Sequence, residues 1–354
     1  MNPSRDAEQG LRSHNASAVG RGAAIFGCEG LNLGREEAAF FRDFDPFGFI
    51  IFARNVESPA QLRRLTADLR EAVGRDAPIL IDQEGGRVQR LRAPQWREWT
   101  PPLDFITAAG VHATRAMELR YHLIAHELRD VGIDADCAPV GDLITDVTHS
   151  FLKNRCYGYD PTTVSLICRA VADGLLAGGC LPVIKHLPGH GRSHVDTHLD
   201  LPRVTATKVD LATHDFAPFK ALGDLPMAMT AHLVFAAYDE RPATQSPEMI
   251  RVIREEIGFK GLLMTDDLNM QALKGDLASR TAASMAAGCD LALHCKGDLA
   301  EMQAVAGKAG DMTPATVNRA EAALTWRHAP TEVDIRALEA ELGLLMPDAS
   351  HGPC

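Results

Sequence analysis

The sequence predicts an α/β protein, and within that class a single (β/α)8 barrel of the TIM type with its active site at the C-terminal ends of the strands. Eight short apolar runs alternate with helical patterns along the chain. Each run is continuously apolar, which is typical of parallel strands that are covered on both faces. Eight such units in about 300 residues fit a closed barrel. An open doubly wound sheet is the alternative, although no Gly-rich turn follows the first run to suggest a dinucleotide site.

The predicted strands and helices alternate after a polar N-terminal segment, and three helices in succession finish the chain. The strands are predicted at 23–28, 48–53, 78–82, 133–140, 180–184, 227–232, 261–266 and 289–295. Helices are predicted at 35–44, 58–73, 104–130, 160–177, 208–222, 246–257, 269–287, 298–309, 314–327 and 332–343. The pairs Ser58-Pro59 and Ser246-Pro247 are typical helix starts. We expect a loose segment over 1–20, one catalytic barrel over 21–345, and a tail over 346–354.

Composition narrows the class of protein. The chain has 354 residues, a formal net charge of -11 and eight cysteines without a CxxC pair. Phosphate binding needs clustered Lys and Arg, so a nucleic-acid partner is not expected. The cysteines indicate reduced thiols in a cytosolic protein, and residues 1–17 contain no apolar signal region. No run is long enough to span a bilayer. We therefore expect a cytoplasmic protein without a membrane partner or a cofactor, and a monomer.

Polar side chains follow most of the predicted strands, at the end where barrel enzymes carry their chemistry. One such residue alone could be a solvated loop charge, but agreement among most strand ends favours a polar concave site. The residues are Asp82, Glu84, Arg87, Asp142, Asn154, Arg155, Lys185, His186, His232, Asp266, Asp267 and His294.

The segment 185–198 is the richest of these polar stretches. Pro188, Gly189 and Gly191 exclude a helix interior, so a buried strand should open here into a polar loop. Four histidines recur at every fourth position and would stack as metal ligands on a helix, but the same breaks remove that face. We therefore expect no metal site. These histidines are His186, His190, His194 and His198.

Two sets of residues suggest catalytic chemistry. Neighbouring strand residues face opposite sides, so only one of Asp266 and Asp267 should point into the barrel mouth, where a carboxylate can act as a nucleophile. Asp196 and His198 would lie on the same side of an extended loop, where the carboxylate can orient the imidazole for proton transfer. A loop-stabilising hydrogen bond between Asp196 and His198 is the alternative.

At this point the sequence resembles a known family. Residues 185–191 resemble the KHFPGHG motif of glycoside hydrolase family 3, and specifically that of the bacterial NagZ-type β-N-acetylglucosaminidases (β-hexosaminidases) of cell-wall recycling. Residues 81–90 are similar to the family's DQEGGRVQR segment, 154–158 to its NRxFG segment, and 264–270 to its nucleophile segment. The motifs occur in the family's order and cover nearly the whole chain. Departures are Leu187 in place of Phe and the triplet 192–194 in place of an acidic residue.

The resemblance implies a role for each site residue. Asp266 would be the nucleophile, and His198 would be the general acid/base, assisted by Asp196. A group of five residues would hold the N-acetylglucosamine ring, whereas Gly189 and His190 would shape the loop. The five residues are Asp82, Arg90, Arg155, Lys185 and His186.

The implied activity is a retaining exo-β-N-acetylglucosaminidase that releases N-acetylglucosamine from peptidoglycan fragments through a covalent glycosyl-enzyme. The fragments would carry this sugar β-1,4-linked to anhydro-N-acetylmuramic acid, with or without a peptide. Alternatives are a β-glucosidase, and a phosphorolytic enzyme, since a neutral imidazole does not repel an anionic acceptor. A metal-dependent barrel hydrolase and a barrel that binds sugar without cleaving it are alternatives of other classes.

Overall fold

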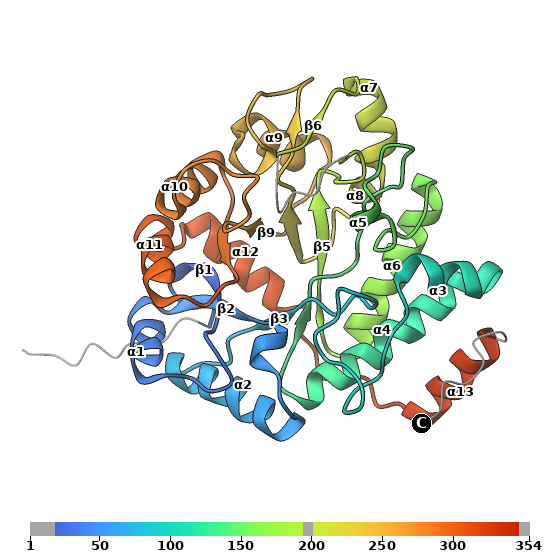
Figure 1. The fold of residues 1–354 in the computed structure, drawn as a ribbon, viewed down its shortest axis with the longest axis horizontal. Coiled ribbons are helices and arrows are strands. Elements are labelled where there is room, and N and C mark those ends of the chain that lie inside the picture. The colour runs from blue at the N-terminus through green and yellow to red at the C-terminus, as the bar shows by residue number, and fades with distance from the viewer. Residues whose placement is uncertain (1–17, 194–200, 347–354) are drawn as a thin grey trace, which may run out of the picture.

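The protein is a closed barrel of eight parallel strands with helices around it, as the computed structural model shows for residues 18–193 and 201–346 (Figure 1). The order of hydrogen-bonded neighbours is β1-β10-β9-β7-β5-β4-β3-β2. The pairs β1–β2 and β1–β10 close the barrel, and both are parallel. The predicted (β/α)8 class is confirmed.

The barrel strands are short and almost wholly buried, because side chains fill the barrel on one face and helices cover the other. Only the last two residues of β9 are partly exposed. The strands are β1 (Gly22–Gly27), β2 (Pro46–Ile51), β3 (Ile79–Ile81), β4 (Ala135–Asp136), β5 (Leu181–Leu187), β7 (Met227–Thr230), β9 (Leu262–Asp267) and β10 (Leu291–His294).

Several helices begin and end where the sequence places them. The side chain of Ser58 accepts a hydrogen bond from the Gln61 backbone N–H (3.2 Å), and Ser246 does the same for Met249 (3.1 Å). Such caps satisfy N–H groups that the first helical turn leaves without partners, and each stabilises by about 1 kcal/mol. The helices are α1 (Arg35–Phe44), α2 (Pro59–Val73), α3 (Pro102–Ala109), α4 (Ala113–Asp130), α5 (Ser150–Lys153), α6 (Pro161–Ala177), α7 (Lys208–Asp210), α8 (Ala217–Ala221), α9 (Pro247–Arg251), α10 (Leu277–Ala287), α11 (Leu299–Ala309), α12 (Pro314–Leu324) and α13 (Ile335–Leu345).

Other helix predictions need correction. The stretch predicted as helical over 104–130 is divided, because Gly110 follows α3 with a positive φ of 56°. The helix predicted from 269 begins only at α10, where Asp276 caps the first turn. The helices predicted over 208–222 and 246–257 contain the π-helical turns η3 (Leu211–Asp215) and η5 (Val252–Glu256).

Two strand boundaries matter for function. The strand predicted to end at Ile184 continues as β5 to Leu187, because Leu187 still pairs with Thr230 of β7. Lys185 and His186 are therefore strand residues and not loop residues. Conversely, only Ala135 and Asp136 of the run predicted over 133–140 form strand β4. A small parallel sheet of β6 (Arg203–Val204) and β8 (Val234–Phe235), which the sequence did not predict, lies outside the barrel.

Two further observations bear on the expected class of protein. Among the described residues, no helix is both long and apolar enough to cross a membrane. The seven cysteines in the described part of the chain are all unpaired, and all but Cys295 are buried.

Candidate active site

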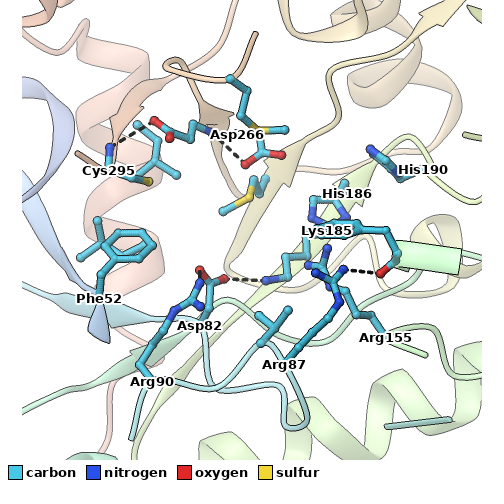
Figure 2. Close-up of a pocket in the computed structure, with 17 residues that line it drawn as sticks. Phe52, Asp82, Arg87, Arg90, Arg155, Lys185, His186, His190, Asp266 and Cys295 are labelled. Carbon is cyan, nitrogen blue, oxygen red and sulfur yellow. Dashed lines mark hydrogen bonds and ion pairs between the residues drawn. The ribbon is translucent and has the colours of Figure 1, made fainter. Parts of the chain in front are cut away.

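A cavity of about 420 Å³ opens at the C-terminal ends of the barrel strands (Figure 2). Six residues predicted for the site line it, and they come from positions far apart in the sequence. Figure 2 shows Asp266 on one side of the cavity and the pair Asp82–Lys185 on the opposite side. The six are Asp82, Arg90, Arg155, Lys185, His186 and Asp266.

One wall of the cavity is a row of alternating charges. Lys185 Nζ lies 2.7 Å from Asp82 Oδ1 and 2.6 Å from Glu84 Oε1. Arg90 donates to the other oxygen of Asp82 at 2.9 Å, and Arg155 donates to both oxygens of Glu84 at 2.7 and 2.8 Å. We call these five residues the charge row. Each carboxylate lies between two cations, so the row is fixed before any ligand binds.

The charge row keeps its carboxyl groups ionised. Burial by itself would raise the pKa of Asp82, but the charges of Lys185 and Arg90 outweigh burial and lower it. For the same reason Arg155 and Lys185 lower the pKa of Glu84 to about 2. The carboxylates in turn raise the pKa of Lys185 against the effect of its burial. The cavity thus contains fixed donors and acceptors, which suits a ligand with many hydroxyl groups.

Asp266 reaches the cavity from β9. One of its oxygens accepts a hydrogen bond from the backbone N–H of Asp267 at 2.8 Å. Burial disfavours its charge, but the imidazoles of His232 and His186, together with that N–H, outweigh burial and lower the pKa of Asp266. A carboxylate that is ionised and partly open to the cavity can act as a nucleophile.

Asp267 is tied to the backbone, as the alternation of strand residues predicts. Its Oδ1 accepts from the N–H groups of Asn269 and Cys295, both at 3.2 Å. It nevertheless borders the cavity beside Asp266, so the expectation that only one of the two faces the mouth is too strict. Burial raises the pKa of Asp267 to about 6.

His232 supports strand β9 next to Asp266. It is fully buried, and its Nε2 lies 3.0 Å from the backbone carbonyl oxygen of Asp267. Because a carbonyl only accepts, Nε2 must carry the proton. The other nitrogen lies 2.7 Å from the hydroxyl of Thr244. His232 therefore holds the backbone next to Asp266 and does not line the cavity.

The segment after Lys185 wraps around a buried carboxylate. Asp142 Oδ2 lies 2.7 Å from His186 Nδ1, and its Oδ1 accepts from the backbone N–H of His190 at 2.7 Å. The imidazole of His190 packs against that of His186 with ring centroids 5.3 Å apart, and it lines the cavity as well. The prediction that His190 only shapes the loop is therefore incomplete.

The chain between His190 and Ser193 is packed tightly against the loop after β4. A Cβ atom added to Gly191 would lie 1.8 Å from the carbonyl oxygen of Leu143, so only glycine fits. Arg192, one of the residues that depart from the family motif, donates to both oxygens of the buried Asp215 at 2.9 Å. Asp196 and His198, the predicted proton-transfer pair, lie outside the described residues.

The sequence reasoning gave no specific role to several residues that border or support the cavity. Glu84 was named only as a polar residue after a predicted strand, and its place two residues after Asp82 was the available signal. Asp142 was noted only as a strand-end charge. Phe52, Met270 and Cys295 also line the cavity, but isolated apolar residues carry no signal of this kind. No group of three or more His, Cys, Asp or Glu residues that could hold a metal ion occurs in the parts of the chain the structure covers.

The fold agrees with comparisons to known proteins. The family model of the glycosyl hydrolase family 3 N-terminal domain matches residues 29–325, so the chain belongs to glycoside hydrolase family 3.

Individual relatives are similar over most of the chain. A β-hexosaminidase of Bordetella avium is 34% identical over 299 residues, which are 82% of this chain and 85% of that protein. The crystal structure of native NagZ from Neisseria gonorrhoeae has a TM-score of 0.80 and 27% identity, and the match covers 93% of this chain and 97% of that one. The same protein in complex with N-trifluoroacetyl-D-glucosamine has a TM-score of 0.76 and 27% identity, with 93% and 99% covered.

Proposed function

We propose that the chain is a retaining exo-β-N-acetylglucosaminidase. In this proposal it releases terminal β-linked N-acetylglucosamine from peptidoglycan fragments in the cytoplasm. The observation that carries the proposal is the ionised Asp266, which faces the charge row across a cavity. The resemblance to β-hexosaminidases and to a NagZ that binds an N-acylated glucosamine supports the choice of sugar. The unpaired cysteines support a reducing compartment.

The charge row supplies the hydrogen-bonding groups for the sugar in the binding step. Lys185, Arg90 and Arg155 only donate, whereas Asp82 only accepts when ionised. A ring hydroxyl both donates and accepts, so it can bridge such neighbouring groups. Because the row is already paired, a bound sugar meets groups that need little reorganisation, which favours transition-state binding.

The proposed reaction has two displacements. In the first, a carboxylate oxygen of Asp266 forms a bond to the anomeric carbon as the bond to the leaving oxygen breaks, and that oxygen takes a proton from the acid. In the second, water attacks the anomeric carbon, loses a proton to the same residue, and releases the Asp266 carboxylate. The configuration is retained because inversion occurs twice.

The cavity favours an acid that is not one of its own carboxyl groups. Asp82 and Glu84 have lowered pKa values and stay ionised at neutral pH. Asp267 has a raised pKa, but one of its oxygens is held by two backbone N–H groups beside the nucleophile. Within the described residues this argues for an acid from another element. We assign that role to His198, oriented by Asp196, as the family motif implies.

Two measurements test the proposed function. The enzyme should hydrolyse nitrophenyl β-N-acetylglucosaminide with a kcat/KM at least about 100-fold above that for nitrophenyl β-glucoside, since buried polar groups made for one sugar discriminate strongly. A 2-fluoro sugar should leave a covalent adduct on Asp266, detected by mass spectrometry of peptides. Preference for the glucoside, or an adduct on another residue, would contradict the proposal.

A further inference from the structure

Asp142 is a fully buried carboxylate that none of the roles above includes. The segment before it runs beside β5: Lys185 donates its backbone N–H to Pro139 (3.0 Å), and Gly141 donates to Lys185 (2.8 Å). This pairing brings Asp142 against His186 at the edge of the cavity.

The carboxylate of Asp142 serves both the ring of His186 and the turn that follows it. Oδ2 lies 2.7 Å from His186 Nδ1, while Oδ1 accepts from the backbone N–H groups of His190 (2.7 Å) and His186 (3.3 Å). A carboxylate can only accept, so Nδ1 of His186 carries a proton. In its neutral form the imidazole has a single N–H, so in that form Nε2 is unprotonated.

The consequence for the cavity is chemical and not only geometric. Nδ1 of His186 is occupied by Asp142, which leaves Nε2 as the ring nitrogen available to a ligand in the cavity that His186 lines. The cations of the charge row are donors only, and each oxygen of Asp82 already accepts from a cation. An unprotonated Nε2 therefore adds a further acceptor to the lone pairs that Asp82 keeps for a ligand.

We propose that Asp142 is a positioning and specificity-determining residue. By holding His186 in the Nδ1–H tautomer, it makes Nε2 an acceptor for one hydroxyl group of the sugar. The packing of His190 against the same ring keeps His186 from turning away. The choice of a sugar as the ligand rests on the proposed function, whereas the tautomer does not.

Replacing the carboxylate by an amide should reverse the polarity of the ring. In Asp142→Asn, Oδ1 can still accept from the two backbone N–H groups. The amide nitrogen then faces Nδ1 of His186 and can only donate, so the proton moves to Nε2. The cavity would lose an acceptor and gain a donor, with little change in shape.

The first test reads the tautomer directly. The full-length protein, labelled with ¹⁵N-histidine, is studied by NMR at pH 8. The signals of His186 are assigned with His186→Gln. We expect the proton on Nδ1 in the wild type and on Nε2 in Asp142→Asn. A wild-type ring protonated at Nε2 would overturn the proposal, even if the variant failed to fold.

The second test identifies the sugar hydroxyl that donates to Nε2 of His186. Nitrophenyl N-acetylglucosaminides are prepared with fluorine in place of each free ring hydroxyl in turn, because fluorine cannot donate. In the wild type one replacement should lower kcat/KM about tenfold, which is the value of one hydrogen bond. In Asp142→Asn the same replacement should cost less than about threefold, since Nε2–H no longer needs a donor. Equal penalties in both enzymes would refute the acceptor role.

A matched control separates this role from loss of a buried charge. Asp134 is also fully buried and accepts a backbone N–H, from Ile79 at 2.7 Å, but it lies at the opposite end of the barrel. Asp134→Asn should keep the wild-type tautomer of His186 and the wild-type pattern of fluorine penalties. If the wild type cleaves no N-acetylglucosaminide, the proposed function fails, while the NMR result still decides the role of Asp142.

Discussion

At the N-terminal end of the barrel, Asp134 and Asp290 lie buried where strands begin, and arginines surround each of them. Asp290 accepts from Arg254 (2.6 Å), from Arg319 (2.8 Å) and from the backbone N–H of Leu263 (2.9 Å). At the C-terminal end the charge row also buries carboxylates among cations, but one edge of it faces a cavity. The same residue types thus fasten the fold at one end and leave hydrogen-bonding groups for a ligand at the other.

The difference lies in what each carboxylate is bound to. Asp290 connects η5 and α12 to the start of β10, so its hydrogen bonds hold separate elements together. Glu84 and Asp82 bind cations that themselves line the cavity. Substitutions at the two ends should therefore separate effects on stability from effects on activity.

The largest effect is expected at Asp266, the proposed nucleophile. Asp266→Asn should lower kcat about 10⁴-fold or more, because it removes the group that forms the covalent bond in the proposed reaction. Within residues 18–193 and 201–346, the one hydrogen bond that the Asp266 side chain makes is with the neighbouring backbone N–H, so the fold should be unaffected. Kinetics with nitrophenyl N-acetylglucosaminide and urea unfolding measure the two effects. A variant that retains a tenth of the activity would remove Asp266 from this role.

Glu84→Gln should affect both activity and stability. It leaves Lys185 and Arg155 with one carboxylate fewer in a buried place, which costs about 3 kcal/mol or more in unfolding free energy. The displaced cations should also lower kcat/KM about 100-fold, as small misplacements of binding groups do. Unfolding in urea and steady-state kinetics on the same preparation test this. A change in stability alone would mean that the charge row only stabilises the fold, as Asp134 and Asp290 do at the N-terminal end of the barrel.

Asp290→Asn should give the opposite pattern. Its arginines and Leu263 lose a charged acceptor, so the unfolding free energy should fall by about 3 kcal/mol. The folded enzyme should keep kcat/KM within about twofold of the wild type, because distant sites couple weakly. Kinetics at a temperature well below the unfolding transition check this point. A large kinetic loss there would erase the distinction between the two ends.

The smallest effect concerns pH and Asp136, the buried last residue of β4. Burial raises its pKa to about 7, and one of its oxygens finds no hydrogen-bond partner in the part of the chain that the structure describes. Between the unfolded pKa of about 4 and the folded value, the folded protein keeps a proton that the unfolded chain loses. This contribution to stability is present below pH 4 and is lost as pH rises through 7.

The side chain in Asp136→Asn cannot titrate, so this variant should not lose unfolding free energy in this way as pH rises. Urea unfolding at pH 5 and pH 8 should show the wild type losing more stability between the two values than the variant does. Comparing the two proteins cancels the contribution of Asp82 and Glu84, whose lowered pKa values act in the opposite direction below about pH 4. Parallel pH profiles would show that Asp136 is ionised in the folded protein.

The sequence predicted the barrel because continuous apolar runs report burial on both faces, and that burial was found for β1, β2, β5 and the others. It missed the length of β5, since Lys185 and His186 are polar and their strand character depends on pairing with β7. It missed the division of 104–130 because one glycine in a long helical pattern is a weak signal.

The residues of the site were predicted one by one, but the hydrogen bonds and ion pairs between them were not. Asp82, Lys185 and Arg155 were named from motifs, whereas the bonds of Glu84 to both cations depend on how two loops meet strand β5. Asp142 could not be assigned a partner because His186 lies on β5, far along the chain, and only the pairing of the segment before Asp142 with β5 brings them together. Asp196 and His198 stay predictions.

Gly191 belongs to the most recognisable motif of the chain, yet the reason for glycine at this position is the lack of room for a side chain. Its neighbour is the carbonyl oxygen of Leu143, which any side chain would displace. A relative that had lost catalysis would still need this glycine to fold. Searches of genomes for active members of the family should therefore weight Asp266 above the glycines of residues 185–191. Asp266 is the proposed nucleophile, whereas Gly191 is needed for packing.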